Sequence, residues 1–400
     1  MTAEDSTAIE RLLAVAPAWT GTPTAADAIG LASHTLLHCG PPANPHHALV
    51  VPTLNSAAVA CVYEGWAGTL VEADELIASG KIRFEPAQDR NVATPMAAVV
   101  SPSMRLLEVS DLNNSGRKAY APINGGGTGG DPAPRYGKKS KEALDLVRFL
   151  NDEVADAIDP ASKEPLPWLP IVDGALLDGD DVHLRHIAAH ATLLSILQER
   201  LGSQFTGSKS EEFIAKWPSF HLNFWMAASK CILAAAEGIK GSSVITAFGG
   251  NGAHFGLQVS GLPGRWFSVE ATPPRGNLRA PYTIEDCVGA YGDSALVECL
   301  GLGAMAQSYC PFMQEFHKDF NHDDILELPA LLLAAEHPGL PNSHARVGLS
   351  ARKIVESGAT PIVELGIVDK TGLNGGFGAG LYRPPTAPFV EACNALEGNA

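Results

Sequence analysis

Three histidines near the middle of the chain have the spacing of side chains that share one helix face. His183, His186 and His190 are separated by three and four residues, and Asp180 comes just before them. Imidazole nitrogens and a carboxylate are ligands that zinc accepts, so the pattern has the chemistry of a metal site. No second set of ligands accompanies it, and histidines also occur on ordinary polar helix faces. We therefore expect no metal here.

Polar residues at tight turns form a second group that could take part in chemistry. Residues 249–252 read Gly-Gly-Asn-Gly, and Asn251 and Gly252 tolerate the positive φ that a tight turn needs. Asp293 and Ser294 precede an apolar run and are residue types that cap helices. The free N–H groups of a capped helix suit a phosphate or a carboxylate. The alternative is that these are ordinary turns and an ordinary cap.

Several sequence motifs that are typical of a known enzyme chemistry are incomplete in this chain. Residues 376–380 are glycine-rich, but Leu-Tyr-Arg-Pro-Pro follows and cannot open the helix that holds a dinucleotide. The segment 137–140 has Pro132 where a phosphate loop requires glycine. Ser294 lacks the flanking glycines of a nucleophile elbow. The Ser-Thr-Arg-Thr phosphate motif of aspartate- and ornithine-type carbamoyltransferases is also absent.

The composition excludes several kinds of partner. The chain has 28 Lys and Arg against 44 Asp and Glu, and its net charge of −16 disfavours binding to nucleic-acid phosphates. No apolar run reaches membrane-spanning length, and the acidic N-terminus lacks a signal-peptide core. The 7 cysteines are scattered without a CxxC pair, which is typical of reduced, buried thiols. We expect a cytoplasmic protein that binds neither nucleic acid nor membranes.

The elements that position these residues indicate an α+β chain. Its 400 residues exceed one ordinary hydrophobic core, so we expect more than one domain. The pattern predicts two mixed α/β domains around a small helical domain. The expected boundaries are residues 1–137, 138–239 and 240–400.

Within these parts, turn residues and periodicity predict individual elements. Asp180 or Asp181 caps a helix over residues 182–201. The Gly- and Pro-rich stretch 124–136 is a candidate linker or mobile loop. Two further features belong to the C-terminal part, namely a β-meander with strands over residues 242–248, 253–260 and 265–269, and a glycine-rich loop over residues 372–380.

Taken together, the motifs resemble those of the YlbE-like family over nearly the whole chain. That family includes a subunit of the bacterial oxamate carbamoyltransferase of anaerobic allantoin breakdown. The shared residues include Tyr63-Glu64-Gly65-Trp66-Ala67, Gly179-Asp180, His183, Arg185, Leu222-Asn223, Asn251-Gly252, Gly292-Asp293-Ser294-Ala295, Glu298, Arg352 and Gly378-Ala379-Gly380.

The resemblance implies a cytoplasmic complex with an acyl-CoA-synthetase-like subunit and a further small subunit. It implies carbamoyl transfer between oxalurate and phosphate, giving carbamoyl phosphate and oxamate. We expect no cofactor. Two departures mark a divergent member. Ala87-Gln88-Asp89 stands where the family has Cys-His-His, and Gly125 stands where the family has Glu.

Carbamoyl transfer needs donors or cations at a developing oxyanion and a group that moves a proton. Arg185 or Arg352 can clamp a carboxylate or phosphate, and His183 or Glu64 can carry the proton. The predicted catalytic residues are His183, Asp293 and Glu64, and the predicted substrate-binding residues are Arg185, Asn251, Gly252, Ser294, Arg352, Gly378 and Gly380.

Other functions remain open at this point. The chain is predicted to be a subunit of a carbamoyl or acyl transferase acting on a small amide or ureido acid. The alternatives are a non-catalytic subunit that binds substrate or acts as a scaffold, and an amide hydrolase. A homodimer is compatible with the composition.

Overall fold

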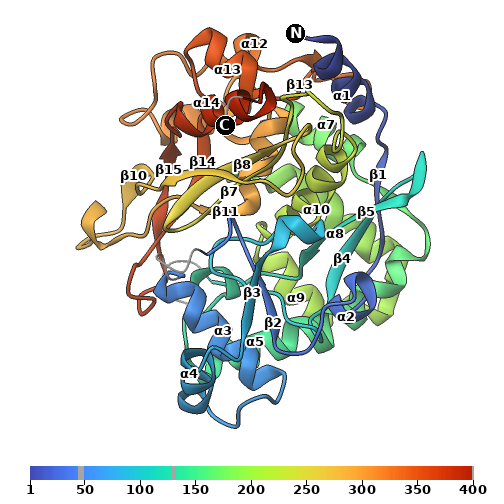
Figure 1. Cartoon of the computed structure of the whole chain (residues 1–400). Helices are drawn as coiled ribbons and strands as arrows, with labels where there is room; N and C mark the ends of the chain where they lie inside the picture. The colour runs from blue at the N-terminus through green and yellow to red at the C-terminus, as the bar shows by residue number, and fades with distance from the viewer. Residues whose placement is uncertain (44–48, 128–131, 399–400) are drawn as a thin grey trace.

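An antiparallel sheet of order β5-β4-β1-β6 supports the N-terminal part of the chain (Figure 1). The computed structural model describes residues 1–43, 49–127 and 132–398. Trp19 on β1 is completely buried and lies opposite Val109 on β4. The strands are β1 (Pro17–Gly21), β4 (Leu106–Asp111), β5 (Asn114–Pro122) and β6 (Leu166–Pro167).

A smaller layer of helices and two parallel strands lies beside this sheet, at the end of the molecule opposite α1 and α14 (Figure 1). Its core includes Leu36, Ala57 and Val99. Thr69 and Glu72 form a capping box that begins α4. The elements are β2 (Thr35–His38), β3 (Arg83–Pro86), α3 (Val51–Tyr63), α4 (Leu70–Ala78) and α5 (Lys141–Arg148).

Helix α10 (Phe220–Ala234) is the central helix of the fold. It packs against β4 and β5 on one side and against the 3₁₀ helix η7 (Asp293–Leu300) on another. A helix that is apolar nearly all round is stable only when it is buried in this way. The neighbouring helices are α7 (Leu169–Leu177), α8 (Ile187–Leu201) and α9 (Lys209–Lys216).

The predicted β-meander is confirmed. Strands β7 (Ile245–Asn251), β8 (His254–Val259) and β9 (Phe267–Glu270) pair in sequence order, and β11 (Tyr291–Gly292) adds to the free edge of β7. Three of the four predicted turn residues belong to β7, because the chain reverses only at Gly252, whose φ is +84°. Glycine reaches this φ without the steric penalty of other residues.

The predicted glycine-rich loop over residues 372–380 is wrong in its second half. Residues 376–380 belong to β15 (Gly376–Tyr382), which pairs with β14 (Val363–Val368) and β10 (Arg275–Leu278). A Cβ on Gly380 would lie 2.5 Å from the Arg275 carbonyl oxygen. The glycines therefore permit close strand packing rather than loop mobility.

Residues from all along the chain join one large apolar core, which extends from Leu12 to Ala392. The predicted mixture of helices and strands is confirmed, and the three-domain division stays a prediction. The remaining elements are α1 (Ala3–Leu13), α2 (Ala25–Ile29), α6 (Ala155–Ile158), α11 (Pro311–Phe316), α12 (Leu328–Leu332), α13 (Ala351–Ser357), α14 (Ala387–Leu396), β12 (Ala335–Glu336) and β13 (Arg346–Val347).

Further predictions concern membrane-spanning helices, the cysteines and a linker. In residues 1–43, 49–127 and 132–398 no helix is both long and apolar enough to cross a membrane. All seven cysteines are free thiols, as their spacing predicted. In the stretch predicted to be a linker, Asn124 is buried and residues Pro134–Tyr136 form a 3₁₀ helix, while residues 128–131 lie outside the described part.

Candidate active site

A cavity of about 180 Å³ lies where the segment after β5 meets the loop before α8, the start of α10 and strands β14 and β15. It is smaller than the pockets of ~300–1,000 Å³ that hold drug-sized ligands, so it suits a molecule of a few heavy atoms. Its polar lining consists of Asn124, Arg135, Tyr136, His183, His186, Ser219, Asn223 and Ser294.

The loop before α8 positions His183 on the cavity wall. Asp181 Oδ1 accepts hydrogen bonds from the backbone N–H groups of His183, Leu184 and Arg185, at 2.6, 2.8 and 3.0 Å. Three donors on one oxygen fold this loop tightly around the carboxylate. His183 is thereby held at the cavity independently of any helix.

This loop also corrects the predicted helix. Helix α8 begins at Ile187, so His183 and His186 precede it and the three histidines do not share a helix face. Asp180 still caps α8, since its carboxylate accepts from the N–H groups of Ile187, Ala188 and Ala189. Among the described residues no group of three His, Cys, Asp or Glu side chains has the arrangement of a metal site.

His183 and Glu298 form a buried pair behind the cavity. His183 Nδ1 lies 2.9 Å from Glu298 Oε1, and the two side chains are 2% and 0% exposed. Burial lowers the pKa of His183, so its ring is neutral near neutral pH. Because Nδ1 faces Glu298, Nε2 is the ring nitrogen left to accept a proton from the cavity.

Backbone groups hold Glu298 in place. Its carboxylate accepts hydrogen bonds from the N–H groups of Glu364 and Met305, at 3.0 and 3.1 Å. A Cβ on Gly303, whose φ is +62°, would overlap both carboxylate oxygens. Burial raises the pKa of Glu298, while the backbone donors oppose that rise.

Arg135 brings a positive charge to the cavity lining. Its guanidinium donates to the carbonyl oxygens of Gly126 and Gly127, at 2.8 and 2.9 Å, and stacks 4.5 Å from the ring centre of Tyr136. These contacts orient the group while leaving its charge uncompensated by any ion pair in the described part of the chain. A fixed guanidinium is well suited to a carboxylate or phosphate.

Asn124 and Asn223 add amide groups to the lining. Asn223 Nδ2 donates to the backbone oxygens of Asn124 and Phe220, at 2.5 and 3.1 Å. Gly125 follows with its backbone close to Phe213, because a Cβ at position 125 would lie 2.8 Å from that ring. A glutamate at this position would therefore not fit the present packing.

Asp293 does not act as the predicted helix cap. The helix that follows is the 3₁₀ helix η7, which Asp293 does not cap with its side chain. Instead its carboxylate accepts from Gly40 N, Gln88 Nε2, Thr94 N and Thr94 Oγ1, at 2.8, 2.6, 2.9 and 3.0 Å. Burial raises the pKa of Asp293 to about 6. Asp293 therefore holds the segments of Gly40, Gln88 and Thr94 together, while its neighbour Ser294 lines the cavity.

At the divergent positions 87–89, Ala87 and Gln88 are buried and Asp89 is exposed. Gln88 donates to the Phe248 carbonyl oxygen as well as to Asp293, at 3.1 and 2.6 Å. Asp89 Oδ1 accepts from Gln258 Nε2 and Trp266 Nε1, at 2.6 and 2.9 Å. Gln88 and Asp89 thus join the N-terminal part of the chain to the β-meander.

Asn251 and Gly252 shape the β7–β8 turn. Asn251 Nδ2 donates to the Pro41 carbonyl oxygen at 3.0 Å, and its Oδ1 accepts from the N–H groups of Ala253 and His254. Both polar atoms of this side chain are therefore used within the protein. The turn does not line the cavity described above.

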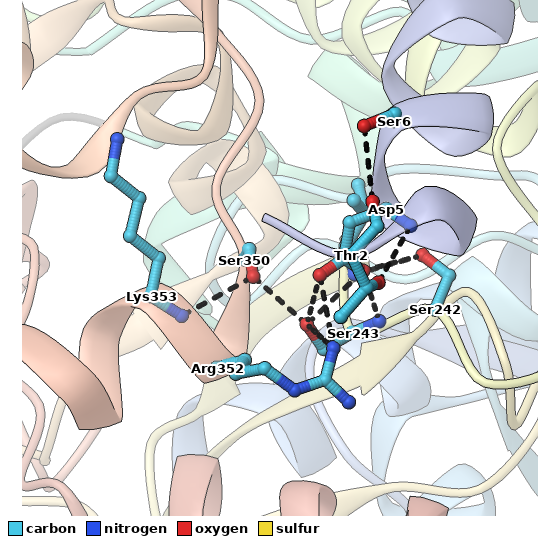
Figure 2. A network of polar contacts seen from close by, with 9 residues as sticks. Thr2, Asp5, Ser6, Ser242, Ser243, Ser350, Arg352 and Lys353 are labelled. Atoms are coloured by element: carbon cyan, nitrogen blue, oxygen red, sulfur yellow. Dashed lines mark hydrogen bonds and ion pairs between the residues drawn. The ribbon is translucent and has the colours of Figure 1, made fainter.

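Arg352 lies in a different polar network, shown in Figure 2. Its Nη1 is 3.0 Å from Asp5 Oδ2, and Asp5 also accepts from Ser242 and Ser243. Asp5 is 1% exposed, so this ion pair anchors α1 to α13 and to the segment before β7. Arg352 does not reach the cavity that His183 lines.

Arg185 and Glu64 also lie outside the cavity lining. Arg185 Nε donates to the Gly179 carbonyl oxygen at 3.1 Å, and its guanidinium lies 4.9 Å from the ring centre of Phe312. Glu64 follows the last residue of α3, is only half-buried, and accepts from Ser103 N and Oγ at 2.7 and 2.8 Å. Glu64 therefore does not reach the cavity as the predicted proton carrier.

The structure therefore brings together three of the predicted residues, His183, Ser294 and Gly378, while Gly380 and the others lie elsewhere. Arg135, Asn124 and Glu298 were not among the residues predicted from the sequence to form the site. Glu298 is among the residues that carry the family resemblance, and this could have indicated that it belongs to the site. Arg135 gave none, since one arginine in a Gly- and Pro-rich stretch has no distinctive pattern.

Comparison with known proteins decides the family. The model of a family described as oxamate carbamoyltransferase subunit AllG matches residues 82–294, which is more than half of the chain. The chain belongs to the AllG family. The matched range includes His183, Arg135, Asn124 and Ser294, so most of the polar cavity lining lies within the AllG match.

Individual relatives agree with this assignment. Oxamate carbamoyltransferase subunit AllG of Escherichia coli K12 is 28% identical over 97% of this chain and 96% of its own length. The uncharacterized protein YahG of the same organism is 29% identical over 98% of this chain and 84% of its own length. A crystal structure of a conserved protein of unknown function from Enterococcus faecalis V583 superposes with a TM-score of 0.89 at 26% identity, covering 99% of this chain and 97% of that one.

Proposed function

We propose that this chain is the subunit of a cytoplasmic carbamoyltransferase complex that binds a small amide or ureido acid, such as oxalurate or oxamate, in the cavity beside His183. The observation that carries the proposal is the His183–Glu298 pair on the wall of a small cavity that also holds a fixed guanidinium. Family membership supports it, since the E. coli relative is named as an oxamate carbamoyltransferase subunit.

His183 has the chemistry to move the proton that the reaction requires. In transfer from oxalurate, a phosphate oxygen attacks the carbamoyl carbon, the bond from that carbon to the oxamate nitrogen breaks, and a C–O bond to phosphate forms. His183 Nε2 takes the proton of the phosphate hydroxyl and returns it to the leaving nitrogen, so protons balance over the step. Glu298 stabilises the imidazolium that forms between the two transfers.

Arg135 and the amide side chains supply recognition. The guanidinium pairs with the carboxylate or phosphate of the substrates. Asn124 and Ser294 provide hydrogen-bonding groups for the amide end. We further propose that an acyl-CoA-synthetase-like subunit and a smaller subunit complete the complex.

The test is the carbamoyltransferase assay with oxamate and carbamoyl phosphate, run on the chain alone and with its co-purified partners. We expect His183→Gln to lower kcat/KM by ~10²–10⁴-fold, the range of a lost general acid–base. His344→Gln is the matched control, because the His344 side chain is 69% exposed and has no part in the proton transfer. Full activity of His183→Gln in the complete complex would contradict the proposal.

A further inference from the structure

A cluster of buried acids lies directly behind the His183–Glu298 pair. Asp181, Glu298 and Glu364 are each 0% exposed, and they come from the loop before α8, from η7 and from β14. Three ionised carboxylates cannot coexist in a dry interior without strong repulsion. At least one of them must therefore hold a proton, and the hydrogen-bond donors around each one decide which.

Asp181 and Glu298 are well supplied with donors. Asp181 Oδ1 accepts three backbone N–H groups. Glu298 accepts two backbone N–H groups together with His183 Nδ1. Donors of this kind stabilise the ionised form of a carboxyl group.

Glu364 has no such support. Among the described residues no backbone N–H donates to its carboxyl oxygens, and the side-chain donor within reach is the neutral amide of Gln307. The nearest basic nitrogen is His317 Nε2, 3.3 Å from Oε1. Burial lowers the pKa of His317 to about 4, so that ring is neutral and supplies no positive charge.

Glu364 instead faces another acceptor. Its carboxyl group lies within hydrogen-bonding reach of Asp181, whose Oδ2 has no donor among the described residues. Two carboxyl oxygens can approach in this way only when a proton lies between them. The other polar or titratable groups that face Glu364 are Glu298, His183, His317, Cys310 and Gln307.

We infer that Glu364 is a protonated carboxylic acid at neutral pH whose O–H donates a hydrogen bond to the Asp181 carboxylate, and that this leaves Glu298 as the ionised partner of His183. The functional meaning of this protonation state rests on the proposed role of His183. Glu364 is then a positioning residue. It removes a negative charge from the cluster and steadies the Asp181 loop that carries His183. Burial raises the pKa of all three carboxyl groups, that of Glu364 to about 8, so the hydrogen-bond donors and not burial select Glu364 as the protonated acid.

Infrared difference spectroscopy of the purified full-length chain, with ¹³C-labelled glutamate, tests the inference without substrate. At pH 7 we expect a carbonyl band of a protonated glutamic acid that disappears in Glu364→Gln. The band should persist in Glu298→Gln and in the control Glu336→Gln, whose wild-type side chain is 57% exposed. Persistence of the band in Glu364→Gln with loss in Glu298→Gln would overturn the inference.

A second measurement needs no variant. The band of the wild-type chain should disappear as pH rises through about 8, the pKa of Glu364. Absence of any glutamic-acid band from wild type at pH 7 would overturn the inference even if Glu364→Gln does not fold. Both readings are independent of turnover, so a failure here is distinguishable from a failure of the carbamoyltransferase proposal, which the His183→Gln assay tests.

Discussion

Glu298 Oε1 lies 2.9 Å from His183 Nδ1 in the interior of the molecule, although 115 positions separate the two residues in the sequence. The contact fixes which ring nitrogen faces the cavity, because an imidazole that donates from Nδ1 has its free electron pair on Nε2. Backbone N–H groups from β14 and from the segment after η7 orient the carboxylate in turn. The candidate site is therefore built from two layers, a cavity wall and a polar layer that supports it.

Glu298→Gln should impair catalysis more than binding. Glutamine keeps the size of the side chain but removes the negative charge that stabilises the imidazolium, and its amide can present N–H to Nδ1 and force the wrong tautomer. We expect kcat to fall by ~10²–10⁴-fold with KM little changed. Steady-state kinetics of the complex measures this. An unchanged kcat would show that Glu298 is only a packing residue.

Gly303→Ala should disturb the His183–Glu298 pair, although position 303 belongs to neither residue. The new Cβ would overlap the Glu298 carboxylate, and position 303 has a φ of +62°. Gly358→Ala is the matched control, since Gly358 has a φ of +69° but a Cβ added there would have nothing within 4 Å. Both variants should lose ~1–2 kcal/mol of unfolding free energy from backbone strain.

Only Gly303→Ala should also lose most of its activity, because it alone displaces Glu298. Urea unfolding and kcat/KM, measured on the two variants side by side, separate strain from displacement. Equal activity in Gly303→Ala and Gly358→Ala would show that the carboxylate adjusts without moving His183.

Arg352→Met should affect stability and leave the chemistry intact. Arg352 pairs with the buried Asp5, and its loss leaves that carboxylate without a cationic partner. We expect a loss of ~1–3 kcal/mol in unfolding free energy. Lys318→Met is the control and should leave the unfolding free energy unchanged within experimental error, because the Lys318–Glu315 pair is 59% and 73% exposed.

The same variant decides between the two roles considered for Arg352. If it clamps substrate, as the sequence suggested, KM should rise in Arg352→Met at a temperature where the protein stays folded. If it anchors α1, KM should equal that of wild type. The position of Arg352 away from the His183 cavity leads us to expect the second result.

His221 should make the protein sensitive to acid. It is completely buried and stacks 5.2 Å from Trp168, and burial lowers its pKa from 6.5 to about 3. A histidine with a depressed folded-state pKa remains neutral in the folded protein while the unfolded chain takes up a proton. Stability from this group is therefore full above pH 6.5 and falls as pH decreases toward 3.

His221→Phe isolates that contribution, since the buried carboxyl groups change stability in the opposite direction in both proteins. Between pH 7.5 and pH 5 the wild type should lose about 2 kcal/mol of unfolding free energy relative to His221→Phe. Urea unfolding at the two pH values provides the comparison. A pH-independent difference between wild type and variant would mean that His221 takes up a proton in the folded protein as readily as in the unfolded chain.

Short-range features of this protein could be predicted from its sequence. The β-meander follows from alternating apolar runs separated by glycine turns, and Asp180 caps α8 because a carboxylate placed before a helix meets its free N–H groups. The family likewise followed from short motifs in a fixed order, and the family match over residues 82–294 confirms it. These features depend on neighbours in the chain, which a sequence displays directly.

The partners of polar side chains were decided by the tertiary structure. Asp293 has the residue type and place of a helix cap, yet Gly40, Gln88 and Thr94 supply its donors from 253, 205 and 199 positions away. Arg352 pairs with Asp5 across 347 positions, and Glu298 supports His183 across 115. A buried charge binds whichever donors the packed core brings to it, because leaving it unpaired costs more than any local preference gains. Residue type and spacing therefore identified the groups capable of chemistry, and only packing decided which of them share a site.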